Sequence, residues 1–424
     1  MTTDPNQPLI QTSPATPDWL KPLRTAATAR YSQLGLPKLR TEAWKFTNLK
    51  ALEGLTVKPS SSSDIQPDLP AALAELKSCR IVLVDGKIAD HDTLPDGVEA
   101  ASLGADAPAW VRESLGTVAS IEHHPFTALN TAQFDGGLAL RVARGKAIET
   151  PIHLVHMSTA GSPDETEISH PRVVVIIEDG AILDLVETHH GTGAYIRNSV
   201  TEISVGADAK LGHYKLQADS RDAFHIAMTA VTVKTNASYD NFALSIGSRL
   251  ARNEVRGHLG GQHIEYHVNG AYMATGDQHL DTSTFIDHAE PNCSSHELYK
   301  GVLLENGHGV FQGKILVRPD AQKTDGYQMN RALLLSPTAE INSKPELEIY
   351  ADDVKCSHGA TVGELEDDQL FYLLARGVPR DRARAILVAA YVDEAIDTID
   401  REPVREAFRA VASEWMTHHV VTVV

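Results

Sequence analysis

The sequence predicts a mainly β protein in which a parallel β-helix is flanked by helical domains at both ends. From about residue 121 to residue 360, short runs of Val, Ile, Leu and Thr alternate with polar residues and are interrupted by Gly, Asn and Asp. A turn followed by a strand recurs within this range, whereas apolar stripes with helical spacing occur before and after it. We therefore predict a mostly helical N-terminal domain with a linker over residues 1–110, a β-helix core over 111–360 and a helical domain over 361–424.

The N-terminal unit contains one clear helical stripe. Apolar residues recur there at intervals of three and four, and the segment closes at Gly35 and Pro37. A Ser-, Pro- and Asp-rich stretch over 58–70 is the expected linker. After it, "CRIVLVDGKIAD" predicts a hairpin, because Asp85-Gly86 is a two-residue turn signal. The residues of the helical stripe are Trp19, Leu23, Ala26, Ala27 and Tyr31.

The β core carries a loose repeat in which a turn precedes a small residue and an alternating strand. Ala181, Ala209 and Ala237 occupy equivalent places in "EDGAILDL", "VGADAKLGHY" and "KTNASYDNF", and each lies 28 residues after the one before it. Ala321 and Ala339 are only 18 residues apart, so the unit is irregular. Coils of two or three short strands that stack at about 4.8 Å explain this pattern best. Periodicity alone leaves a jelly roll or a sandwich open.

The C-terminal unit is predicted to hold three helices. "DDQLFYLLARGVPRDRARAILVAAYVDEAI" indicates two helices separated by Gly377 and Pro379, and a third starts near Pro403. The first is apolar around most of its circumference and so needs cover on more than one side. Either the end of the β-helix or a partner subunit can supply that cover.

Composition excludes several classes of function. The formal charge of −18 repels nucleic acid and anionic membrane surfaces, and it also disfavours a β-helix enzyme that acts on acidic polysaccharide. The opening residues show no export signal, and no apolar run reaches the roughly 18 residues of a membrane span, so we expect a cytoplasmic protein. Three widely spaced cysteines cannot by themselves bind an iron–sulfur cluster, which normally takes four thiolates. No phosphate-binding loop or dinucleotide fingerprint occurs either.

Two short patterns are candidates for metal chemistry. In "LEIYADDVKCSHGAT" a single alternating strand would place Cys356 and His358 on one face together with Glu348, Tyr350 and Asp352. In "GGQHIEYHVNG" a strand would group two histidines and one carboxylate, a set that can hold iron or manganese and would suit a free-standing metalloenzyme. That set is His263, Glu265 and His267, and the nearby pair Cys293 and His296 is expected to be structural. A packed thiol beside a surface histidine is the plainer interpretation of Cys356 and His358.

Three stretches of the sequence resemble the SufB/SufD family, the scaffold subunits of the SUF iron–sulfur cluster assembly system. They are 342–396, which includes "KCSHGATVG", 309–340, and "RTEAWKFTNL" at 40–49. Together they span most of the chain. The low cysteine content and the "KCSHGATVG" signature are similar to the SufD branch. The resemblance implies a right-handed β-helix and a non-catalytic scaffold role.

The resemblance also implies partners and a site. A SufB chain would pair through the last β coils as a heterodimer, with a homodimer possible in its absence, and the C-terminal helices would dock the SufC ATPase. His358, with Cys356 as a less certain neighbour, would share iron or a transient Fe-S cluster with SufB. The lone chain would bind no cofactor, and ATP would enter only through the partner ATPase. The expected ATPase-docking residues are Leu370, Phe371, Leu373, Leu374 and Arg376.

Overall fold

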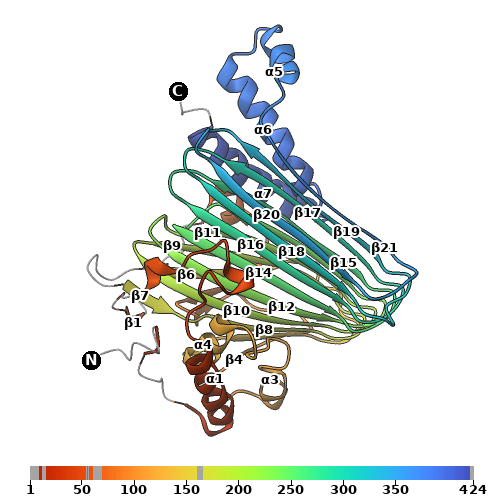
Figure 1. Cartoon of the computed structure of the whole chain (residues 1–424). Coiled ribbons are helices and arrows are strands. Elements are labelled where there is room, and N and C mark those ends of the chain that lie inside the picture. Colours follow the sequence, from red (N-terminus) through yellow and green to blue (C-terminus); the bar gives the residue numbers. More distant parts are fainter. Residues whose placement is uncertain are drawn as a thin grey trace.

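The computed structural model describes residues 9–11, 16–53, 55, 57–60, 69–159 and 166–420, so part of the expected linker lies outside the described residues. The chain forms a parallel β-solenoid in which successive strands alternate between two sheets (Figure 1). The mainly β prediction, with a parallel β-helix between helical ends, is confirmed. Only the β2–β3 and β4–β5 pairs among the described strands are antiparallel. Helical elements near the N-terminus are η1 (Asp18–Leu20), α1 (Lys21–Leu34), η2 (Glu42–Trp44), η3 (Lys50–Leu52), α2 (Ala71–Ala74), α3 (Ala109–Ser114) and α4 (Pro125–Gln133).

Sheet A runs from the N-terminal to the C-terminal end of the solenoid through β4 (Val98–Ser102), β5 (Leu138–Val142), β8 (Arg172–Ile177), β10 (Tyr195–Val205), β12 (Phe224–Val233), β14 (Leu250–Leu259), β16 (His279–His288), β18 (His308–Val317) and β20 (Glu340–Ile349). Two short strands, β1 (Val57–Pro59) and β7 (Thr166–Ser169), join it beside β10. Sheet B runs through β3 (Lys87–His91), β2 (Cys79–Val84), β6 (Ile152–Thr159), β9 (Ile182–Thr192), β11 (Lys210–Ala218), β13 (Ser238–Ser245), β15 (Glu265–Ala274), β17 (Ser294–Leu303), β19 (Asp325–Leu334) and β21 (Lys355–Gly363).

One coil of the solenoid is one strand of each sheet. Ile182 pairs with Lys210 and Lys210 with Ser238, which gives 28 residues per coil and confirms the repeat seen in the sequence. Later coils are longer, since His308 pairs with Glu340 after 32 residues. Ala321 and Ala339 are not successive repeats, because they precede β19 and β20, which belong to different sheets.

The core of the solenoid is the space between the two sheets, which alternate residues fill from both sides. Tyrosines stack there along the coils, as Tyr239 and Tyr266 do with ring centroids 5.1 Å apart. Glycines make room for them. A Cβ added at Gly301 would lie 2.3 Å from Cε2 of Tyr272, so this strand position accepts no side chain.

The N-terminal helices pack on the outer face of sheet A, and the N-terminal elements follow most of the sequence predictions. Helix α1 ends before Gly35, which has a φ of +62°, and the β2–β3 hairpin turns at Asp85 and Gly86, both with positive φ, as predicted. The sequence did not reveal α4 inside the range predicted as all-β. Every residue from Phe126 to Gln133 is buried, so α4 shows no amphipathic stripe.

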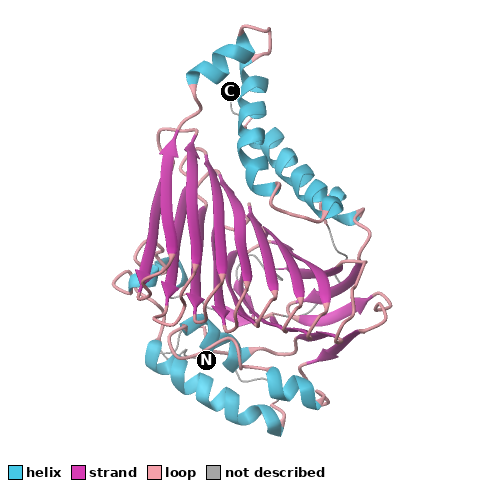
Figure 2. Ribbon diagram, turned by 90° about the vertical axis from the view of Figure 1, so that its right-hand side faces the viewer, coloured by secondary structure: helices cyan, strands magenta, loops and turns pink. Residues whose placement is uncertain are grey.

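The C-terminal helices are α5 (Asp367–Leu374), α6 (Arg380–Ile396) and α7 (Glu402–His419), as the sequence predicts. Val388 of α6 and Phe408 and Trp415 of α7 pack on the outer face of sheet B, against residues such as Phe242 and Met273. Figure 2 shows these helices along one side of the sheets, and Figure 1 shows α5 beyond the ends of the strands. The solenoid ends at β20 and β21, which are the last strands of their sheets within the described residues.

Candidate functional site at the open end of the solenoid

The predicted pair Cys356 and His358 lies on β21, in the last coil of the solenoid. This terminal coil, β20 and β21, has no further strand paired beyond it in the described part of the chain. The two side chains are two residues apart on one strand and so face the same side, as predicted. Cys356 packs against the hydrophobic core, and its Sγ would lie 3.3 Å from a Cβ at Gly326, whereas His358 is exposed. Both side chains therefore face the interior of the solenoid, and no further coil covers them among the described residues.

The prediction of one continuous strand through this region was wrong. Strand β20 ends at Ile349 and β21 begins at Lys355, so a turn separates Tyr350 and Asp352 from the cysteine and the histidine. Glu348 belongs to the other sheet and forms an ion pair with Lys314. The acidic and aromatic residues expected beside Cys356 thus do not join it, because the alternating pattern continues across the turn without a break.

A column of polar residues leads inward from His358. His358 pairs in register with Gln328, and Gln328 pairs with Glu297 on the next strand. The Gln328 amide donates a hydrogen bond to the Glu297 carboxyl group, and both residues are fully buried. Burial raises the pKa of Glu297 to about 7, although hydrogen bonds from Gln328 and Thr284 oppose this shift. The interior behind His358 therefore contains a polar column beside its apolar residues.

The chemistry that the terminal coil can perform alone is limited. One imidazole and one thiol are too few ligands for a cluster or a closed metal site. Burial and the charge of Asp325 raise the pKa of the Cys356 thiol, so it is protonated at neutral pH and is a weak nucleophile. A metal or cluster bound at this coil would therefore need further ligands.

Helix α5 exposes the apolar surface that the sequence predicts. Leu370 is buried, but Phe371 is 71% exposed and Tyr372 is 56% exposed. Leu373 and Leu374 are half-buried, and the exposed Arg376 guanidinium lies 3.5 Å from the centre of the Tyr372 ring. The solenoid does not cover this helix, so the surface is available for another molecule.

The rival metal set does not form in the structure. His263 lies in the turn before β15 with a φ of +58°, whereas the exposed Glu265 begins that strand. His267 instead binds Asp240, with its Nδ1 2.5 Å from Oδ1. The prediction that these three side chains share one strand face was therefore wrong for His263, which lies outside the strand.

Cys293 immediately precedes β17 and His296 lies on it, next to β15 of the rival set. The buried Cys293 donates its thiol to the Gly261 carbonyl at 3.1 Å. His296 instead stacks on Tyr327, with ring centroids 4.8 Å apart. The two side chains therefore have separate structural contacts, as expected.

Comparison with known proteins identifies the family. The chain matches the family model described as "SUF system FeS cluster assembly, SufBD core domain" over residues 158–391, and the "SufBD protein N-terminal region" over residues 6–154. The chain belongs to the SufBD family.

Curated relatives agree with this assignment along nearly the whole chain. The SufBD protein is 30% identical to the iron-sulfur cluster assembly protein SufD of Escherichia coli, over 88% of this chain and 87% of the relative. It is 30% identical to the chloroplastic protein ABCI7 of Arabidopsis thaliana, over 94% and 87% of the two chains. It is 31% identical to an iron-sulfur cluster assembly SufBD family protein of Synechocystis, over 89% and 86%. Among the described residues of the SufBD chain, no helix is long and apolar enough to cross a membrane.

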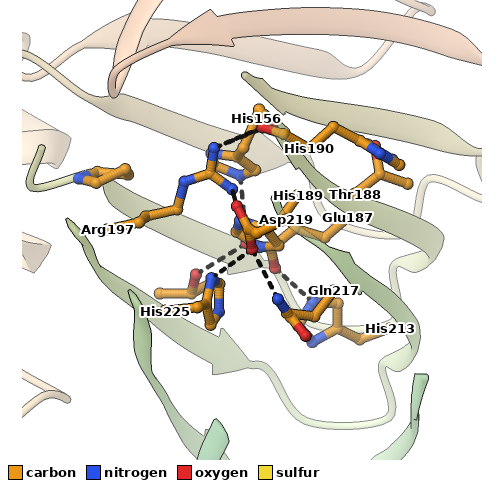
Figure 3. A network of polar contacts seen from close by, with 12 residues as sticks. His156, Glu187, Thr188, His189, His190, Arg197, His213, Gln217, Asp219 and His225 are labelled. Atoms are coloured by element: carbon orange, nitrogen blue, oxygen red, sulfur yellow. Dashed lines mark hydrogen bonds and ion pairs between the residues drawn. The ribbon is translucent and has the colours of Figure 1, made fainter. Parts of the chain in front are cut away.

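Sequence reasoning missed a second group of titratable residues inside the SufBD solenoid. His156, Glu187, His189 and His213, here called the interior cluster, lie between the sheets near its N-terminal end (Figure 3). Three different strands supply them, about 30 residues apart in the chain. A signal exists in hindsight, since each follows inward-facing apolar residues on its strand, but it requires the coil register to be known.

Proposed function

We propose that this chain is a non-catalytic scaffold subunit of an iron–sulfur cluster assembly complex. In this proposal it pairs with a SufB-like chain through its terminal coil and docks a SufC-type ATPase through α5 and α6. The observation that carries it is the exposed His358 at an open solenoid end, in a chain that offers no complete set of cluster ligands there. The nascent cluster is the cargo of this site and is bound only with ligands from the partner.

The terminal coil has the properties of a docking edge. Its strands present unpaired backbone groups, to which strands of a second solenoid can add. Exposed apolar side chains flank this edge, including Tyr350 at 62% exposure and Val362 at 52%. Removing such apolar surface from water favours association. A SufB-like solenoid that covers this edge would also enclose His358 and bring its own ligands to it.

We assign ATPase docking to α5 because this helix exposes an apolar face and is connected to the sheets through α6. Lys300 of β17 is buried, and its Nζ lies 2.5 Å from Glu394 of α6 and 4.3 Å from the centre of the Tyr391 ring. Strand β17 pairs with β19, and β19 pairs with β21. A movement of α5 and α6 driven by ATP on the partner would therefore be transmitted through two strands to the terminal coil.

Co-expression with the cognate SufB-like chain and ATPase tests this proposal. Native mass spectrometry under anaerobic conditions is expected to find a four-subunit assembly with one copy of this chain. Tyr350→Asp is expected to remove the SufB-like chain but retain the ATPase. A chain that remains a homodimer, or stays unpartnered, when both proteins are present would contradict the proposal.

A further inference from the structure

The interior cluster lies where an uncompensated polar group is costly. His156 comes from β6, Glu187 and His189 from β9, and His213 from β11, and all four side chains are at most 1% exposed. His156 and His189 are paired in register, and their rings stack with centroids 4.4 Å apart and planes 8° apart. Figure 3 shows the cluster beside a second group made by Arg197, Asp219 and His225. The two imidazoles thus face one carboxylate from adjacent coils.

Three of the side chains converge on a single point. Glu187 Oε1 lies 3.2 Å from His156 Nε2 and 3.0 Å from His189 Nε2. These three donor atoms lie within 4.8 Å of one another. Tetrahedral bonds of about 2.0–2.1 Å would separate such atoms by about 3.3 Å, so the donor atoms are spaced as in a metal site, and the two nearly parallel rings would turn to direct both Nε2 lone pairs at one ion. Two histidines and one carboxylate are the ligand set of many zinc and ferrous iron sites.

His156 is not satisfied by the protein alone. Among the described residues neither of its ring nitrogens has a partner with hydrogen-bond geometry, although Nε2 is aimed at the Glu187 carboxylate. A buried polar group without a hydrogen bond costs about 1–3 kcal/mol. A cation between the two histidines and the carboxylate would give the Nε2 lone pair a partner and would explain why the ring is held there.

The protonation states suit a cation. Burial lowers the pKa of both His156 and His189, which keeps them neutral, as metal ligands must be. Burial alone would raise the pKa of Glu187, but contacts with three histidines hold it well below its usual value, so it is a carboxylate.

A further pair of side chains orients the carboxylate. His213 binds the other oxygen of Glu187, with its Nε2 2.9 Å from Oε2. The Tyr239 hydroxyl lies 3.0 Å from the remaining ring nitrogen of His213 and can donate to it, which fixes the tautomer. Metal-binding side chains are commonly oriented in this way by residues that do not touch the ion.

One buried cation competes with a metal ion. Lys215 pairs in register with Glu187 and is 5% exposed. Its ammonium group balances the carboxylate when no metal is bound. A divalent ion would add positive charge beside this buried ammonium group, so Lys215 opposes metal binding by charge repulsion.

We propose that His156, Glu187 and His189 form a buried site for one divalent transition-metal ion, either zinc or ferrous iron. His213 and Tyr239 are its positioning residues. The ion binds as the chain folds and joins the first coils of the solenoid, because the closed interior leaves the ligand atoms out of contact with solvent. The site is separate from the terminal coil and stands whether or not His358 binds cargo.

The test uses the full chain folded in the presence of zinc, then freed of loose metal and assayed for bound zinc. About one equivalent is expected in the wild type, with zinc X-ray absorption showing only nitrogen and oxygen ligands. His189→Ala is expected to lose the zinc. His288→Ala is the matched control, because it removes a fully buried imidazole from β16, a coil distant from the interior cluster, and should keep the zinc.

Two milder variants keep the test decisive if His189→Ala does not fold. Tyr239→Phe removes only the hydroxyl group and is expected to weaken zinc binding by about 10–100-fold. Lys215→Met removes the competing cation and is expected to tighten zinc binding by about tenfold or more. The proposal would be overturned, in favour of a metal-free ionic network, if the wild-type chain holds no zinc or if sulfur is among the zinc ligands. It would also be overturned if both variants bind zinc with unchanged affinity.

Discussion

Replacing Phe371 with Asp tests whether α5 docks the ATPase. A Phe side chain that becomes fully buried contributes about 1.5–3 kcal/mol, and 71% of Phe371 is exposed in the free chain. Docking can therefore gain about 1–2 kcal/mol from this ring, and a buried Asp without a partner adds a further cost. Since 1.4 kcal/mol is a factor of ten, we expect the ATPase affinity to fall by at least about 10–100-fold.

The same exposure means that Phe371→Asp should leave the fold intact. Exposed positions usually shift stability by about 0.5 kcal/mol or less, so circular dichroism and the urea midpoint should match the wild type. Binding to the immobilised ATPase gives the affinity, and Tyr350→Asp is the matched control, which should keep the ATPase and lose the SufB-like chain. If Phe371→Asp binds the ATPase normally, or if it unfolds the solenoid, α5 is not the docking helix.

Three further predictions concern the solenoid interior and its link to α6. Folding raises the pKa of the Glu297 carboxyl group from 4.5 to about 7. The contribution of this group to the free energy of unfolding is therefore fully present below about pH 4.5 and is lost as the pH rises through 7. Glu297→Gln should therefore be more stable than wild type at pH 8, by up to about 3 kcal/mol in urea unfolding, and equal stability at that pH would show that the carboxyl group is solvated. Gly301→Ala should lower the unfolding free energy by about 1–3 kcal/mol, because its Cβ would overlap Tyr272, and an unchanged urea midpoint would contradict this close packing. Lys300→Met removes the contact with Glu394 and should reduce iron loading of the assembled complex without loss of subunits, whereas normal loading would exclude this route of coupling.

The sequence predicts the length of the early coils but not where each later coil begins. The spacing of Ala181, Ala209 and Ala237 is the true coil length, because each follows the turn before a strand of sheet B. The later coils vary in length, so Ala321 and Ala339 suggest a repeat that does not exist. Helix α4 was hidden because it is buried on all sides and carries no stripe.

The spacing of residues along one strand predicts part of the candidate site. The rest depends on which strands the fold places side by side. Cys356 and His358 are neighbours on one strand, so alternation was enough to place them together. Alternation failed at Tyr350, where the chain turns without a Gly or Pro signal. The interior cluster joins residues such as His156 and Glu187 from successive coils, and no pattern within one segment indicates that they meet.

Iron bound by the anaerobic four-subunit complex, compared between wild type and His358→Ala, is the most direct test of the shared interfacial site. His91→Ala, an exposed histidine of β3 at the other end of the solenoid, is the control. Metal held by the lone chain is measured separately and subtracted, so that an ion in the interior cluster does not count. The scaffold account predicts that His358→Ala loses the remaining iron but keeps every subunit, while His91→Ala keeps both. Full iron in His358→Ala would contradict it.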